Sequence, residues 1–134
     1  MGRYERRDVD YFVNDAKTRR KKILERACHF GDKFKRKSTP KAIKLKVLLR
    51  DHLECVQCHE SFKIINKDFG LGSGCYHHII PLVYGGLNTD ENICLLCKDC
   101  HNKIHSIAIG NENPEKYYQL LENYITRGCF WTRY

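Results

Sequence analysis

Apolar residues recur at helical spacing in three stretches of the chain. Residues 9–28 predict an amphipathic helix. Residues 42–49 predict a shorter one, because Ser38-Thr39-Pro40 supplies a capping hydroxyl and a proline for the first turn. Asn113-Pro114 begins a third helix, whose apolar face is formed by Tyr117, Leu120, Leu121, Tyr124 and Ile125. Helices are therefore expected towards both ends of the chain.

Between these helices the pattern changes to short apolar and β-branched runs, which are typical of strands. Residues 75–80 predict one strand, which Pro81 ends or places at an edge. Residues 93–96 predict a returning strand, with an irregular turn at Gly85-Gly86 and Asn88-Thr89. A small sheet flanked by helices predicts an α+β fold.

The chain has 134 residues, with 24 Lys and Arg against 16 Asp and Glu, a formal net charge of +8. Such an excess favours a polyanionic partner, although a purely solvating role explains charge alone equally well. The candidate phosphate contacts are Arg19, Arg20, Lys21 and Lys22 in the first helix, Lys35, Arg36 and Lys37 in a basic linker, and Lys103. We expect residues 1–39 to form a basic helical extension of a domain at residues 40–134.

Four of the eight cysteines form two closely spaced pairs, Cys55/Cys58 and Cys97/Cys100. A two-residue gap lets a knuckle present two thiolates to one ion, so two such pairs predict a closed structural zinc site. Short strands are expected beside the first knuckle, the second of them at Phe62, Ile64 and Ile65. The alternative is that the cysteines are reduced, buried thiols. The remaining cysteines, Cys28, Cys75, Cys94 and Cys129, lack this pairing, and Cys94 is expected in the core.

No apolar run resembles a signal peptide or reaches the roughly 20 residues that span a bilayer. We therefore expect an intracellular, cytoplasmic protein without membrane contact, where paired cysteines serve as metal ligands more often than as disulfides.

A second group of candidate ligands consists of histidines. His101 and His105 are four residues apart and share one face of a helix, where two imidazoles can bind one metal ion. His77 and His78 are adjacent on a strand and point to opposite sides, so one can bind metal while the other faces elsewhere. The other histidines, His29, His52 and His59, are expected to be structural.

The string from Tyr76-His77-His78 through Gly85-Gly86 and Asn92 to Cys100-His101 and His105 resembles the HNH (His-Asn-His) endonuclease motif. The resemblance covers about residues 50–106. It implies a ββα-metal core, with two antiparallel strands and a helix around a divalent ion that assists phosphodiester hydrolysis.

The resemblance also implies roles for single residues. His78 matches the general base, and Asn92 matches the central asparagine, which orients the loop or, in some members, binds metal. His101 matches the last metal ligand. His77 stands where aspartate is common, and with His105 it resembles the nuclease domains of DNA-cleaving colicins. Three imidazoles suit Zn²⁺, Ni²⁺ or Mn²⁺ better than Mg²⁺, which prefers oxygen ligands.

The expected substrate is therefore duplex DNA, nicked by a metal-dependent endonuclease. The resemblance fits a phage packaging apparatus, a mobile element or a restriction system. No helix-turn-helix is recognisable, so sequence specificity is expected to be weak or to come from a protein partner, for example a phage terminase. Two alternatives are a zinc-binding nucleic-acid adaptor without catalysis and a nuclease that cleaves RNA. The oligomeric state, monomer or dimer, stays open.

Overall fold

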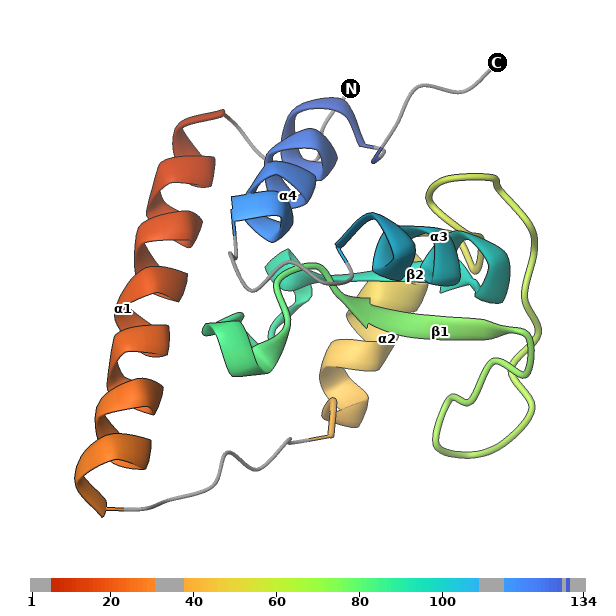
Figure 1. The fold of residues 1–134 in the computed structure, drawn as a ribbon. Helices are drawn as coiled ribbons and strands as arrows, with labels where there is room; N and C mark the ends of the chain where they lie inside the picture. The colour runs from red at the N-terminus through yellow and green to blue at the C-terminus, as the bar shows by residue number, and fades with distance from the viewer. Residues whose placement is uncertain (1–5, 31–37, 109–114, 129, 131–134) are drawn as a thin grey trace.

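The computed structural model describes residues 6–30, 38–108, 115–128 and 130, and the backbone forms mainly helices around a small sheet (Figure 1). The helices are α1 (Arg6–Phe30), α2 (Lys41–Arg50), α3 (Lys98–Ala108) and α4 (Glu115–Arg127). The strands are β1 (Gly74–His78) and β2 (Ile93–Cys97), with 3₁₀ turns at Leu82–Tyr84 and Asp90–Asn92 between them. This arrangement confirms the predicted α+β fold. None of the helices in the described ranges is long and apolar enough to cross a membrane.

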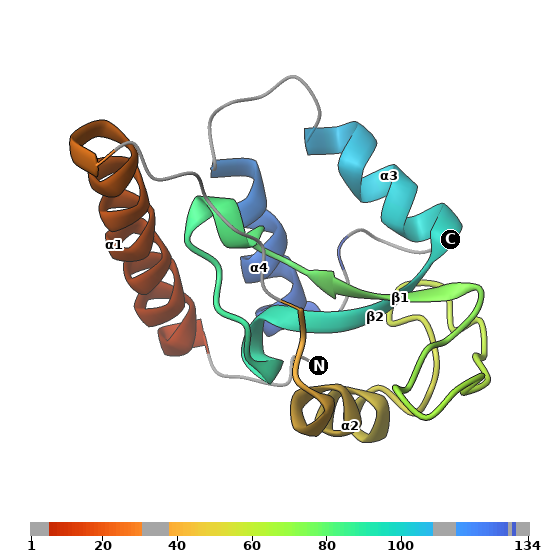
Figure 2. The same ribbon diagram turned by 90° about the horizontal axis from the view of Figure 1, so that it is seen from below.

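The two strands pair antiparallel, with His77 opposite Cys94 and His78 opposite Ile93. In Figure 2 the sheet lies between α2 on one side and α3 on the other. Every residue of β2 is buried because both faces of the sheet are covered by helices. Since α3 follows β2 directly, the strand–strand–helix unit expected from the sequence is confirmed.

The predicted strand at Phe62, Ile64 and Ile65 is wrong. Only an isolated bridge pairs Glu54 with Ser61, on either side of the cysteine turn. Ile65 instead donates its backbone N–H to the carbonyl of Gly70 at 2.9 Å, which closes a separate loop. Ile64 and Ile65 have β-branched side chains but are 45% and 64% exposed. Strand propensity alone therefore did not make this segment a strand, because it lacks a pairing strand. The predicted strand at residues 75–80 also ends earlier, at His78.

Helix α4 buries the apolar face that its sequence predicted, including Tyr124 and Ile125, which are fully buried. It packs against α1, and α1 also contacts the 3₁₀ turn Leu82–Tyr84 (Figure 1). The close approach occurs at Gly85, where a Cβ atom would lie 2.0 Å from the carbonyl oxygen of Ala16 and φ is +91°. Glycine is therefore required at this position for α1 to reach the loop.

A buried ion pair joins the end of α2 to β2. The Arg50 guanidinium donates to both carboxylate oxygens of Asp51, at 2.9 and 3.0 Å. Asp51 also accepts the backbone N–H of Leu95 at 3.1 Å, and Arg50 donates to the carbonyls of Asp90 and Ile93. The pair thus holds the helix against residues 40 to 44 positions further along the chain.

Asp51→Ala is expected to lower the free energy of unfolding by about 3–5 kcal/mol, the usual cost of removing one partner from a buried pair. Asp51 is 3% exposed, whereas the Lys41–Asp68 pair at 2.9 Å has both side chains 60% exposed. Asp68→Ala is the matched control and should cost no more than about 1 kcal/mol, since exposed pairs contribute little. Urea denaturation measures both variants, and equal losses would contradict this role of Asp51.

Candidate metal centres and active site

Four cysteines meet at the junction of the 55–58 turn, β2 and α3. All four Sγ atoms lie within 4.8 Å of one another, and they belong to Cys55, Cys58, Cys97 and Cys100. The Sγ atoms of Cys58 and Cys97 are 3.6 Å apart, too far for a disulfide, in which the sulfurs are about 2.0 Å apart. A zinc–sulfur bond of about 2.3 Å would give sulfur separations close to this value in a tetrahedron. The predicted four-cysteine set is therefore positioned to bind a metal ion.

The backbone around these cysteines is arranged for thiolates. The N–H of Cys58 points to the sulfur of Cys55 at 3.5 Å, and the N–H of Cys100 points to that of Cys97 at 3.4 Å. Burial acts to raise the pKa of Cys55, but backbone amides, that of Cys58 foremost, hold this pKa below its ordinary value. Burial raises the pKa of Cys97 and Cys100, so a cation bound between the sulfurs would be needed to favour their thiolate forms.

The other described cysteines lie outside this set. Cys94 is fully buried, as predicted, and burial raises its pKa well above the ordinary value. Cys75 points to the carbonyl of Leu96 at 3.3 Å, and burial raises its pKa to about 11. Cys28 is exposed on α1. His59 follows Cys58 but faces Glu54, with Nδ1 3.4 Å from Oε2, so it is not part of the cysteine cluster.

Two of the three candidate imidazole ligands meet across the strand–strand–helix unit. The ring of His77 on β1 lies 5.0 Å, between centroids, from that of His101 on α3, in an edge-to-face arrangement. Phe130 packs against the same His77 ring at 6.2 Å, and His77 is 3% exposed. The two imidazoles are close enough for one ion to bind both. His105 lies one turn further along α3, and its side chain is outside the described part of the structure.

His78 contacts a different part of the protein from His77, as strand alternation predicts. Its Nε2 atom lies 2.8 Å from Oδ1 of Asn88, in the loop between the strands. The amide of Asn88 in turn donates to the backbone carbonyl of Ser38 at 3.0 Å. No functional role of Asn88 was predicted from the sequence. A polar residue just after Gly85-Gly86, in the turn between the two predicted strands, was the signal that could have identified it.

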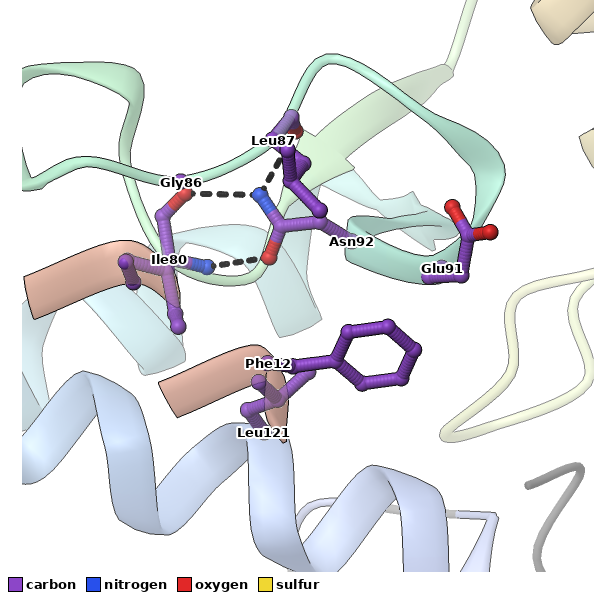
Figure 3. A pocket seen from close by; sticks show the side chains of 8 residues that line it. Phe12, Ile80, Gly86, Leu87, Glu91, Asn92 and Leu121 are labelled. Atoms are coloured by element: carbon purple, nitrogen blue, oxygen red, sulfur yellow. Dashed lines mark hydrogen bonds between the residues drawn. The ribbon is translucent and has the colours of Figure 1, made fainter. Parts of the chain in front are cut away.

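Asn92 ties this loop to the end of β1, as Figure 3 shows. Its Oδ1 accepts the N–H of Ile80 at 2.9 Å, and its Nδ2 donates to the carbonyls of Ile80 and Leu87, both at 2.9 Å. These bonds end the strand by occupying the backbone groups of Ile80. Gly86 fits beside them because a Cβ there would lie 1.9 Å from the carbonyl oxygen of Ile80.

A small cavity of about 10 Å³ lies beside Asn92, between the loop and the helices (Figure 3). Phe12 and Ala16 of α1 and Leu121 of α4 form its other walls. The first and last helices therefore pack directly against the loop that Asn92 braces. Leu87, the residue before Asn88, also lines this cavity, which therefore lies between the two helices and the segment that leads to Asn88.

The basic residues of α1 border a wider groove of about 510 Å³. Arg19, Lys22 and Arg26 line its helical wall, and the opposite wall includes Gly86 and Asn88. Arg19 donates to Asp15 at 2.9 Å, so one acidic side chain accompanies the three basic ones.

The other predicted phosphate contacts differ in their surroundings. Lys21 on α1 and Lys103 on α3 are exposed. Arg20 is half-buried, with its guanidinium over the ring of Tyr84 at 5.1 Å, so it joins α1 to the loop. Lys35, Arg36 and Lys37 lie outside the described residues.

Comparison with known proteins gives two findings. Residues 55–106 match the family model for HNH endonucleases. The chain is also similar to the type IV methyl-directed restriction enzyme EcoKMcrA of Escherichia coli (strain K12), with 40% identity over 42 residues. These residues are 31% of this chain and 15% of that protein, so the match spans well under two thirds of the relative.

Proposed function

We propose, from the premise that residues 55–106 form an HNH endonuclease domain, that the protein hydrolyses phosphodiester bonds of DNA with a divalent metal ion. The observation that carries this proposal is the meeting of His77 and His101 across the strand–strand–helix unit. One of these imidazoles comes from a strand and the other from a helix, and a third, that of His78, follows on the same strand. A structural metal site would not require this third imidazole, so the arrangement supports a catalytic role.

The proposed catalytic ligands are His77, His101 and His105. A bound divalent ion supplies electrostatic stabilisation for charge that develops on the phosphate and the leaving oxygen. A set of imidazoles suits Zn²⁺, Ni²⁺ or Mn²⁺ better than Mg²⁺. The packing of Phe130 against His77 supports this role, because it fixes the plane of a ligand ring before any ion binds.

His78 is the proposed general base, which takes a proton from the attacking water. Neutral imidazole suits this task near physiological pH. Asn92 is the proposed positioning residue of the loop. Both ends of its amide bond to backbone groups, which supports loop fixing over metal binding for this residue.

The ion at the four cysteines is proposed to be zinc with a structural role. Four thiolates fill a tetrahedral coordination shell and leave no position for substrate. The site joins the 55–58 turn to β2 and α3, and so holds His101 on its helix against β1. One metal site would thus position a ligand of the other.

The groove beside α1 is the proposed path of a nucleic-acid strand. Phosphates lying in it would face Arg19, Lys22 and Arg26, and at its other wall would approach Asn88, the partner of His78. Lys21, Lys103 and the linker residues Lys35, Arg36 and Lys37 would add contacts outside the groove. In this proposal residues 1–39 are an extension of the domain at residues 40–134 that binds the backbone and reads no bases.

Of the settings considered, restriction gains support from the match to EcoKMcrA, a restriction enzyme by name. The match covers too little of that protein to carry its target over to this chain. A role in phage genome packaging or a mobile element, with a terminase or other partner supplying specificity, stays part of the proposal.

The proposed nuclease is tested with the purified chain, supercoiled plasmid and Mg²⁺, Mn²⁺, Ni²⁺ or Zn²⁺ in turn. Cleavage with at least one ion is expected, and an RNA of matching sequence should be cut more slowly. Preferred cleavage of the RNA would favour the RNA nuclease. Tight DNA binding without cleavage by any ion would favour the non-catalytic adaptor and contradict the proposal.

The chain carries one candidate catalytic group of histidines, namely His77, His78, His101 and His105. A monomer is therefore expected to nick one strand of a duplex at a time. Supercoiled plasmid should therefore convert first to open circle, and linear DNA should follow later. A time course with few cuts per plasmid, paired with light scattering of the protein, measures this order. Linear product from the outset, with no open-circle precursor, would show two sites acting together, as in a two-fold dimer.

A further inference from the structure

We propose that Asn88 is the positioning residue of His78, and that its amide holds the neutral imidazole with the proton on Nε2 and the lone pair on Nδ1. This inference rests on the proposed function for the role of His78 as the base. It adds a residue and a tautomer that neither the family match nor the sequence assigned. The ligand set and the metal do not enter it.

The first step is the orientation of the Asn88 amide. An asparagine amide can be turned by 180°, so its partners decide which end is nitrogen. The carbonyl of Ser38 can only accept a hydrogen bond, and it lies 3.0 Å from Nδ2. The amino group therefore faces Ser38, and Oδ1 faces His78.

The second step is the tautomer. Oδ1 of Asn88 can only accept, and Nε2 of His78 lies 2.8 Å from it, so Nε2 is the donor. A neutral imidazole carries one N–H, which leaves the lone pair on Nδ1. Nδ1 then carries the lone pair that can accept a proton.

The third step is that the amide itself is held in place. Asn92 donates to the carbonyl of Leu87, the residue before Asn88, at 2.9 Å. Ser38 lies just ahead of α2, whose first turn is closed by the bond from Lys44 N–H to the Pro40 carbonyl at 3.0 Å. Asn88 is thus fixed from both sides, and it in turn fixes a ring that is only 9% exposed.

The alternative is that Asn88 only joins the loop to α2 and contacts His78 incidentally. The two roles predict different results for Asn88→Ala. A purely structural link lowers the melting temperature and leaves the chemistry of each folded molecule unchanged. A positioning role lowers kcat, because the ring is free to turn and change tautomer. KM should change little, because Asn88 is an uncharged residue of the groove wall and the cationic side chains Arg19, Lys22 and Arg26 on the opposite wall are kept.

The experiment uses the full chain with its metals bound. Nitrogen-15 NMR of the His78 ring, at a pH where imidazole is neutral, reports directly which nitrogen carries the proton. We expect the Nε2–H form in the wild type and a mixture of both tautomers in Asn88→Ala, with kcat for plasmid cleavage lowered about tenfold, less than the loss of the base itself. Asn88→Asp keeps an oxygen acceptor for Nε2–H and should retain the wild-type tautomer.

Asn66→Ala is the matched control. Asn66 also braces a loop through its side chain, with Oδ1 accepting the N–H groups of Asp68 and Gly70 at 2.9 and 3.0 Å. This variant should lose stability but keep the His78 tautomer and kcat.

A wild-type ring protonated on Nδ1, or wild-type kcat and tautomer in Asn88→Ala, would overturn the inference. If Asn88→Ala does not fold, the tautomer in the wild type and in Asn88→Asp still decides the matter. A wild type that cleaves no nucleic acid would refute the proposed function, whereas the NMR result tests the Asn88 contact separately.

Discussion

Cys58→Ser is expected to unfold the domain, although Cys58 is an exposed residue. The loss would come from one missing ligand in a closed four-thiolate site, where metal-binding energy is also folding energy. Structural zinc in small domains contributes an apparent binding free energy of about 10–16 kcal/mol, more than the whole stability of many domains. The backbone also joins the 55–58 turn to β2, since Val56 donates its N–H to the carbonyl of Leu95 at 3.0 Å, but one such bond contributes only about 0.5–1.5 kcal/mol.

Cys28→Ser is the matched control, because Cys28 is exposed like Cys58 but lies on α1, outside the cluster. Thermal unfolding followed by circular dichroism should show a cooperative transition for Cys28→Ser and none for Cys58→Ser. Metal analysis of the wild type, stripped of loosely bound ions, should find about one zinc per chain, as one four-ligand site requires. Absence of zinc, or equal stability of both variants, would reject the structural site.

The elements that the sequence predicted well are those whose signal is local. The apolar face of α4 follows from helical spacing alone, and Tyr124 and Ile125 are buried as that spacing requires. The pairing of β1 with β2 followed from two short apolar runs around a glycine-rich turn. The cysteine cluster followed from two pairs with a fixed gap, since knuckle geometry is set within four residues.

The features that could not be predicted depend on contacts between distant positions. Arg50 reaches the carbonyl of Ile93, 43 residues away, and Asn88 reaches that of Ser38, 50 residues away. No periodicity links such pairs, because the folded backbone alone brings them together. The wrong strand at Ile64 and Ile65 has the same origin, since strand formation depends on a partner that the local sequence does not reveal.

The candidate site contains some features that local sequence predicts and others that depend on contacts between distant positions. The placement of His77 and His78 on opposite sides of one strand follows from backbone geometry, and their separate contacts with His101 and Asn88 agree with it. The two hydrogen bonds between the Asn92 side chain and the backbone of Ile80 could be identified only from the structure, because a central asparagine can bind either metal or backbone. The roles of these residues in catalysis stay predictions.

His78→Ala is expected to lower the rate of DNA cleavage at least about 10²-fold, the scale of losing a general base. DNA binding should survive, because the groove residues Arg19, Lys22 and Arg26 are untouched. His59→Ala is the matched control, since His59 is an exposed histidine that pairs with Glu54 outside both sites.

Because His78 is buried, a folding defect has to be separated from a chemical one. Single-turnover cleavage at saturating protein measures the chemical step, and circular dichroism with DNA-binding assays on the same samples establishes the folded fraction. His78→Asn, which is smaller but still polar, provides a second variant if alanine destabilises the strand. A loss of about 10²-fold or more in folded, DNA-bound protein identifies His78 as the base. Cleavage at the wild-type rate by either variant would instead show that another group accepts the proton from water.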